Sequence, residues 1–340
     1  MKKLICLIIT IIASFSSLLT GCSSSSEISI YAPDGAPALA LSSLIKADLN
    51  KTTINVVASD KIASCVTGKN SKADVCILPI NMASNLLGNG ENYKMIGTIT
   101  HGNFYFLSKA DIVIDKQNIN SLIGKTIGVM QLQNVPGLTF KYTLNSLGVN
   151  YITIQDVSEK QSDKVNLMAI NKIETARTDI DVFLIPSPQA DLITNATNLN
   201  LVGSLGALYS LNGFPQAVIV VKNEVLENNL ATIKQIASQI KNVNDYLIEE
   251  NFLEICTLIN SKLESGLTPV FNENTLTPSV IQHLQIKYVS CKNSQEDVST
   301  FINNLKTIEP NSVKTFNSNF FYLGDLWQKT LLKTAYYILY

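Results

Sequence analysis

The sequence predicts an α/β protein with two lobes, each a mostly parallel β-sheet flanked by helices. Short apolar runs of strand length alternate with segments of helical spacing from residue 27 to about residue 212. Several runs end in a small-residue turn that opens a helix, as in parallel βα units. After residue 213 one more strand leads into a mostly helical segment, so the chain returns to the first lobe. Two crossing strands, 104–108 and 217–221, then form a hinge around a cleft.

The first βα unit shows this design most clearly. A short extended run at 27–31 is followed by Tyr31-Ala-Pro-Asp-Gly-Ala-Pro37. Asp34 or Gly35 can cap the next helix, and Pro37 suits its first turn, where no N–H is needed. The apolar face of this helix consists of Leu41, Leu44, Ile45 and Leu49. Its free N–H groups can hold an anion or a polar ligand group.

The same design occurs twice more along the chain. The strand 73–79 runs into Asn81 and a short helix, and the strand 126–130 runs into Gln131-Leu-Gln-Asn-Val-Pro-Gly137 and another helix. The carboxyl ends of parallel strands lie at one edge of a sheet, so the loops that follow them line a common crevice. The sequence therefore predicts a ligand-binding crevice at these strand ends.

The first lobe is predicted to begin with residues 27–108. A helix capped by Asp60 carries Ile62, Cys65 and Val66 on its apolar face and ends at Gly68. The remaining strands are expected at 54–57, 75–78, 93–99 and 103–108.

The second lobe is predicted at 109–212, and residues 213–323 return to the first lobe. The expected strands are 126–130, 151–157, 181–186, 199–203 and 213–222, and the expected helices of the second lobe are 118–123, 136–147, 160–171 and one from Gln189. The returning segment is expected to be helical at 224–230, 232–250, 252–265, 278–287 and 294–306. Residues 324–340 form an apolar C-terminal tail.

The composition excludes several classes of function. The chain of 340 residues has a net charge of −1 and a single arginine, Arg177, which argues against a nucleic-acid partner. Cysteine and histidine show no metal-site spacing, and no cofactor motif is present. Beyond the N-terminus these residues are Cys65, Cys76, Cys256, Cys291, His101 and His283. Cys65 and Cys76 are expected to be small core residues, and one disulfide is left open.

The N-terminus has the features of a bacterial lipoprotein signal. Met1-Lys-Lys3 is basic, residues 4–13 are apolar, and Leu19-Thr-Gly-Cys22 has the order of a lipobox. We expect residues 1–21 to be removed, Cys22 to carry the lipid, and residues 22–26 to act as a tether. The protein would then be exported and anchored to the outer face of the cytoplasmic membrane, or periplasmic where an outer membrane is present. An ordinary secretory signal that happens to contain a cysteine is the alternative.

Several motifs resemble one family, the substrate-binding lipoproteins of ABC importers, in the branch of sulfonate, nitrate and thiamine-precursor binders. They are Asp34-Gly-Ala-Pro-Ala-Leu39, Ala73-Asp-Val-Cys-Ile-Leu-Pro79, Gly124-Lys-Thr-Ile-Gly-Val129, Val135-Pro-Gly137 and Gly213-Phe-Pro-Gln216. The resemblance covers about residues 27–323. It implies a type II periplasmic-binding-protein fold, hinged closure on a small molecule, and delivery to a permease driven by ATPase subunits. Residues 171–177 and 325–340 depart from the family pattern.

Candidate ligand-binding residues lie in the loops after strands. They are Asp34, Gly35, Ala36, Asn81, Thr100, His101, Asn103, Gln131, Gln133, Asn134, Gly137, Thr139, Ser187, Gln189 and Phe214. Tyr31, Phe104 and Phe214 could stack on a ring. The structural alternatives are helix capping for Asp34, a structural or surface role for His101, turn chemistry for Gln133 and Asn134, and core or hinge packing for Phe104 and Phe214.

The candidate pocket contains many amides and few charges. The expected ligand is therefore neutral, or an anion held by helix N-termini, with a small heterocycle such as a pyrimidine vitamin precursor slightly favoured over a sulfonate. An enzyme on the same fold is an alternative, but Asp34 and His101 are its only visible acid–base pair. A surface lipoprotein with an interaction role is another. We expect a monomer without catalytic activity.

Overall fold

The computed structural model describes residues 27–68, 71–173 and 179–326. The predictions made for the signal peptide 1–21, for Cys22 and its tether, for Arg177 and for residues 327–340 lie outside the described residues.

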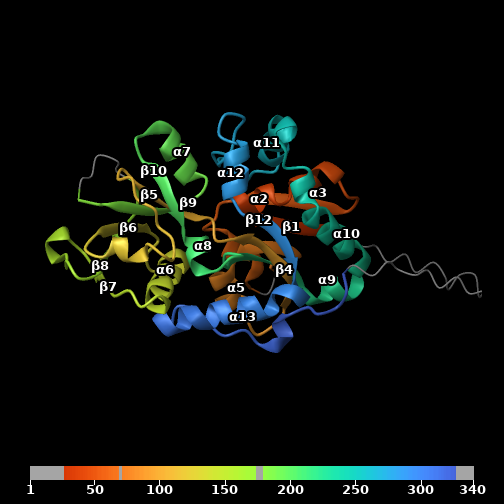
Figure 1. The fold of residues 1–340 in the computed structure, drawn as a ribbon. Coiled ribbons are helices and arrows are strands. Elements are labelled where there is room, and N and C mark those ends of the chain that lie inside the picture. Colours follow the sequence, from red (N-terminus) through yellow and green to blue (C-terminus); the bar gives the residue numbers. More distant parts are fainter. Residues whose placement is uncertain (1–26, 69–70, 174–178, 327–340) are drawn as a thin grey trace, which may run out of the picture.

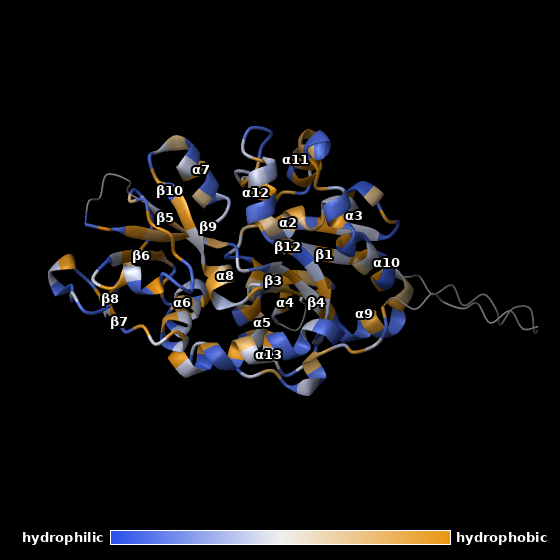
Figure 2. Ribbon diagram, in the orientation of Figure 1, coloured by the Kyte–Doolittle hydropathy of each residue, from blue (hydrophilic) through white to orange (hydrophobic). Residues whose placement is uncertain are grey.

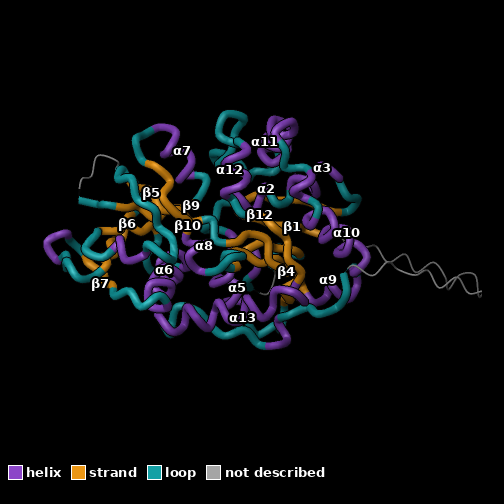
Figure 3. Tube along the Cα trace, in the orientation of Figure 1, coloured by secondary structure: helices purple, strands orange, loops and turns teal. Residues whose placement is uncertain are grey.

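The described residues form two six-stranded sheets side by side (Figures 1 and 3). The first sheet has the order β12-β4-β11-β3-β1-β2. Its parallel half contains β1, β2 and β3, whereas β11 runs antiparallel between β3 and β4, and β12 forms the edge. The bounds are β1 Ile28–Pro33, β2 Thr52–Val57, β3 Val75–Pro79, β4 Tyr93–His101, β11 Pro215–Lys222 and β12 Ile286–Ser290.

The second sheet has the order β10-β5-β9-β6-β8-β7. Strands β9, β6, β8 and β7 are parallel, and β5 and β10 add an antiparallel pair at one edge. The bounds are β5 Phe104–Ser108, β6 Thr126–Met130, β7 Tyr151–Ile154, β8 Val165–Ile170, β9 Val182–Pro186 and β10 Asn200–Ser204. The predicted class of two mostly parallel sheets flanked by helices is confirmed.

Helices cover both faces of each sheet (Figure 1). Those of the first lobe are α2 Ala36–Leu39, α3 Ser42–Ala47, α4 Ile62–Val66, α5 Ile80–Leu87, α9 Asn223–Asn228, α10 Leu230–Lys241, α11 Phe252–Asn260, α12 Pro278–His283 and α13 Cys291–Ile308. Those of the second lobe are α6 Val135–Ser146, α7 Gln189–Ala196 and α8 Leu205–Tyr209. Short 3₁₀ turns lie at Ile119–Leu122, Val157–Glu159, Val243–Asp245, Glu249–Asn251 and Ser318–Phe320.

Most of the predicted elements are present, but the helix predicted at 160–171 is wrong. This segment contains the strand β8, which lies between β6 and β7. Val165 and Leu167 are buried on one face of the sheet, whereas Ile170 is buried on the other. Apolar residues on both faces of a strand lose the simple alternation, so this short run resembled a helical pattern.

Other helices also differ from the prediction. The helix predicted at 232–250 ends at Lys241. The helix predicted at 278–287 ends at His283, and Gln285, with a φ of 52°, turns the chain into β12. The first helix is divided into α2 and α3 around Leu41, and its N-cap is Gly35, whose φ of 100° favours glycine. The Asp34 side chain does not cap this helix.

The chain crosses between the sheets at two places. Strand β5 lies wholly in the second sheet, so the first crossing is at Gly102 and Asn103 rather than within 104–108. Strand β11 likewise lies wholly in the first sheet, so the return crossing runs through α8 and residues 210–214 rather than within 217–221. A side chain on Gly102 would come within 3.1 Å of both the Phe214 ring and the Gly206 Cα atom, and its φ is 59°. This crossing therefore requires glycine.

The strands form the apolar interior of both lobes (Figure 2). One core cluster contains residues of both sheets together with α6 and α13. The opposite faces of the two sheets are buried in two separate clusters. Within the described ranges, we find no helix whose length and hydrophobicity would suit it to span a membrane.

Candidate functional site

The predicted ligand residues gather at two strand-end edges, one in each lobe. In the first sheet, β1 and β3 end at Pro33 and Pro79, and β4 ends opposite the start of β11, with His101 paired to Pro215. In the second sheet, β6 and β9 end beside the start of β5, with Pro186 paired to Phe104. Because Gly102 and Asn103 connect β4 directly to β5, the two edges meet at this crossing.

Asn103 links the two edges by hydrogen bonds. Its backbone N–H donates to Oε1 of Gln216 in β11 at 3.1 Å. Its carbonyl accepts from the backbone N–H of Ser187 at 2.9 Å, and its Nδ2 donates to the Ser187 carbonyl at 3.4 Å. The Asn103 Oδ1 is buried and accepts no hydrogen bond from the described residues. A buried acceptor of this kind is suited to a donor from a ligand or a water molecule.

His101 is held in place beside this crossing. Its Nε2 lies 3.0 Å from Oγ1 of Thr98, and its backbone N–H donates to the carbonyl of Gln285 at 3.2 Å. Burial, with a smaller effect from the nearby positive charge of Lys287, lowers the pKa of His101 to about 4. The imidazole is therefore neutral at pH 7.

The edge of the first lobe contains the other predicted residues of that lobe. Asp34 Oδ1 accepts from the N–H of Gly35 at 2.7 Å, and its Oδ2 accepts from the N–H of Val270 at 2.9 Å. Asp34 therefore fixes the loop before α12. Asn81 is the second residue of α5 and is half-buried, so it lies beside the free N–H groups of that helix. Gly35, Ala36 and Thr100 are buried.

The edge of the second lobe presents amide side chains to solvent. Gln131, Gln133 and Asn134 are exposed in the turn before α6, and Asn134 N–H donates to the Gln131 carbonyl at 2.9 Å. Gln189 is exposed at the start of α7, whereas Ser187 is buried and its Oγ donates to Asp191 Oδ2 at 2.7 Å. These side chains and helix N-termini are polar groups that could hold a small ligand.

Three predicted residues have packing roles. Thr139 is fully buried in α6 and donates to the Val135 carbonyl at 2.6 Å. A side chain on Gly137 would collide with the Leu132 carbonyl, so glycine allows the loop to fold against the first turn of α6. Phe214 is fully buried and stacks on Phe301 of α13, with ring centroids 5.2 Å apart. We therefore place Thr139, Gly137 and Phe214 in the supporting structure.

An interlobe cavity of about 810 Å³ lies beside the crossing. The first lobe lines it from β4, β12, α12 and α13, and the second lobe lines it from β5 and α8. Of the predicted ligand residues only His101 lines it. The cavity is also lined by residues that were not predicted, because no sequence pattern indicated that β12 and α13 reach the crossing. They are Tyr105, His283, Lys287, Asn293 and Asp297.

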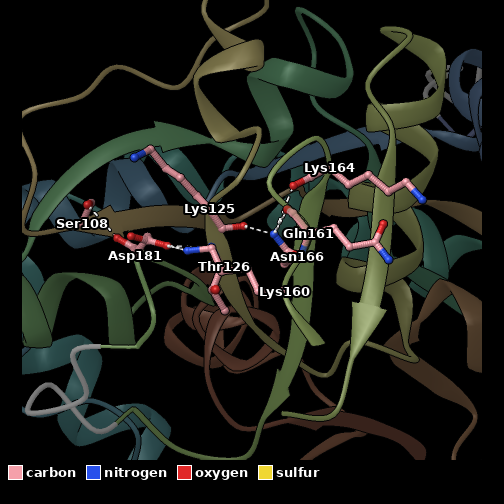
Figure 4. A network of polar contacts seen from close by, with 8 residues as sticks. All are labelled: Ser108, Lys125, Thr126, Lys160, Gln161, Lys164, Asn166 and Asp181. Atoms are coloured by element: carbon pink, nitrogen blue, oxygen red, sulfur yellow. Dashed lines mark hydrogen bonds and ion pairs between the residues drawn. The ribbon is translucent and has the colours of Figure 1, made fainter. Parts of the chain in front are cut away.

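A polar network at the far end of the second sheet is structural (Figure 4). Asp181 Oδ2 accepts from the N–H of Thr126 at 2.7 Å, and Ser108 Oγ donates to the Asp181 carbonyl at 2.9 Å. Asn166 donates to the carbonyls of Lys125, Gln161 and Lys164. These residues lie where β6, β8 and β9 begin, so the network and its cavity of about 240 Å³ are remote from the crossing.

The described residues contain no group of three or more His, Cys, Asp or Glu side chains that could hold a metal ion. The four cysteines in the described part, Cys65, Cys76, Cys256 and Cys291, are buried and free, and burial raises the pKa of each thiol. A raised pKa leaves little thiolate at pH 7, so these cysteines are unsuited to nucleophilic chemistry.

Solved structures share this architecture. An ABC-transporter protein from Parabacteroides distasonis superimposes with a TM-score of 0.66 at 16% identity, covering 88% of this chain and 100% of that one. The periplasmic aliphatic sulphonate-binding protein SsuA from Escherichia coli gives 0.64 at 13% identity, covering 91% and 96%. The alkanesulfonate-binding protein SsuA from Xanthomonas axonopodis pv. citri, bound to MOPS, gives 0.51 at 13% identity, covering 85% and 96%. No protein-family model and no curated protein gives a significant match. The chain thus has the two-lobe fold of periplasmic binding proteins.

Proposed function

We propose that the protein is an extracytoplasmic solute-binding protein of an ABC importer, without catalytic activity. It captures a small molecule between its lobes and delivers it to a permease driven by ATPase subunits. The single observation that carries this proposal is the convergence of strand ends from both sheets at the Gly102–Asn103 crossing. There the buried Asn103 Oδ1 accepts no hydrogen bond from the part of the chain that the structure describes.

The fold and the N-terminus support the same function. The two neighbours with TM-scores of 0.66 and 0.64 are described as an ABC transporter and a sulphonate-binding protein. The lipobox-like Leu19-Thr-Gly-Cys22 fits a protein that is exported and anchored through a lipid on Cys22. Anchoring would keep the binding lobes close to the permease at the membrane surface.

We propose a small organic anion, such as an alkanesulfonate, as the ligand. Phe104 and Phe214 are 5% and 0% exposed, so two of the three aromatic residues considered for stacking on a ring are in the core. The free N–H groups at the starts of α5, α6 and α7 favour an anion. One neighbour was solved with MOPS, a sulfonate. A small heterocycle remains the alternative ligand.

A thermal-shift screen of the soluble piece from Ser23 onward tests this function. The panel contains MOPS and other sulfonates, nitrate, thiamine precursors, flavins, amino acids and purines. A ligand at 100 times its dissociation constant adds about 2.7 kcal/mol of stability, which raises the melting temperature by several degrees. If no compound stabilises the protein, an interaction role without a small ligand becomes the better explanation.

Two substitutions locate the ligand within the interlobe region. Asn81 lies at the α5 edge, whereas Asn293 lines the cavity beside β12. We expect N81A to abolish the thermal shift and N293A to leave it unchanged. The reverse pattern would place the ligand in the 810 Å³ cavity and contradict the proposed edge.

A further inference from the structure

Among the residues that the structure describes, the two lobes share an apolar core on one side only. On that side the cluster around α13 joins Val218 of the first sheet and Phe106 of the second. On the other side the first sheet packs on α12 through Val280, whereas Tyr105 of the second sheet belongs to a separate cluster. Opening the lobes on the side of α12 and α7 therefore breaks no apolar core, so that side is the easier one to open.

A polar contact joins the lobes on this easier side. His283 is the last residue of α12 in the first lobe, and Asp191 lies in α7 of the second. The His283 Nδ1 is 2.6 Å from Asp191 Oδ1, and their side chains are 24% and 7% exposed. The Tyr105 hydroxyl donates to the His283 carbonyl at 2.9 Å, and the two rings lie 4.7 Å apart. Solvent therefore screens this contact only weakly.

The same contact is connected to the candidate ligand edge. Ser187 Oγ donates to the second carboxylate oxygen of Asp191 at 2.7 Å, and Ser187 N–H donates to the Asn103 carbonyl. Burial alone would raise the pKa of Asp191, but the hydrogen bonds from His283 and Ser187 outweigh it and lower that pKa. Both carboxylate oxygens are thus engaged, one toward each lobe.

We propose that Asp191 and His283 form an interlobe clamp, a pair of positioning residues that hold the lobes closed over the Asn103–Ser187 edge. Its effect on ligand affinity rests on the proposed function, but its effect on lobe closure does not. A hydrogen bond to a charged group is strong enough to shift a closed–open equilibrium by about tenfold. Loss of the clamp would lower ligand affinity by the factor by which the closed fraction falls, because only the closed form holds the ligand on both sides.

Small-angle X-ray scattering of the purified, unliganded protein tests the clamp directly. We expect H283A and D191N to increase the radius of gyration and the maximum dimension. The variant H283N should retain the wild-type profile, because an asparagine amide can donate in place of Nδ1. The matched control is Q282A, an exposed neighbour on the same helix, which should scatter as the wild type does. Unchanged scattering of both H283A and D191N would overturn the proposal.

A titration with MOPS tests the effect on affinity. If the wild type binds MOPS, H283A should bind it more weakly, by the factor by which its closed fraction falls, and Q282A should bind it equally well. Equal affinity in H283A would refute the coupling of the clamp to the ligand. If the wild type does not bind MOPS, the result counts against the sulfonate ligand, and the scattering comparison still decides whether the clamp exists.

Discussion

At the scale of single residues, His101 makes the stability of the protein depend on pH. Its pKa is lowered from 6.5 to about 4 by burial, so between these values the unfolded chain binds a proton that the folded chain does not. Stability should therefore fall as the pH decreases from 6.5 toward 4, by about 3 kcal/mol from this residue. Urea unfolding at pH 7 and pH 4 should show this loss in the wild type and a smaller loss in H101Q. An identical pH dependence in both proteins would contradict this assignment.

The variant D34A tests whether Asp34 is a structural carboxylate or a ligand contact. Its two oxygens accept from the N–H groups of Gly35 and Val270. We expect D34A to destabilise the protein by about 2 kcal/mol, because two backbone donors lose a charged acceptor. The measurement is the urea midpoint of D34A beside that of D60A, an exposed carboxylate on the same lobe. If D34A kept normal stability but lost ligand binding, Asp34 would be a ligand contact instead.

For individual residues, the sequence could not separate a ligand-binding role from a packing role. Asn103 and Ser187 were predicted as neighbours of the cleft, and the structure joins them by hydrogen bonds. Thr139 and Phe214 were predicted beside the same cleft, but both are 0% exposed and have packing roles. Burial of an individual side chain depends on packing between distant segments, such as Phe214 on Phe301, which no local pattern records.

At the scale of elements, β8 depends on a single buried amide. Asn166 is 0% exposed, and its Nδ2 donates to three backbone carbonyls at 3.2, 3.0 and 3.1 Å (Figure 4). We expect N166A to lower the free energy of unfolding by about 3 kcal/mol, since it removes these donations and the bond that Asn166 Oδ1 accepts from the Gln161 N–H at 2.8 Å. The control is N171A, exposed just beyond the other end of β8. Equal unfolding midpoints for N166A and N171A would show that the network does not stabilise the strand.

Local patterns predicted well the elements that are bounded by clear turn residues. The strand–turn–helix units beginning at β1, β3 and β6 were predicted because small-residue turns follow apolar runs. The strand β8 was missed because apolar residues lie on both of its faces, and β12 was missed because its pairing partner β4 lies far along the chain. Their strand conformation is fixed by tertiary pairing, which overrides weak local preference.

At the scale of the whole molecule, the sequence predicted two lobes with two crossings, but it placed the first crossing within 104–108. The structure has it at Gly102 and Asn103, because β5 pairs with β9 in the second sheet. The sequence also gave no indication that α13 would contribute to a core shared by both lobes. That core limits how the lobes can move and leaves the side of α12 and α7 free to open.

The central claim is that one small molecule is bound by both lobes at once. Amide hydrogen exchange, measured with and without the compound that gives the largest thermal shift, tests it most directly. We predict slower exchange at both edges together, around 80–83 and 100–103 in the first lobe and at the crossing, and around 131–137 and 187–191 in the second. Protection confined to one lobe, or exchange that no compound in the panel changes, would contradict capture between the lobes.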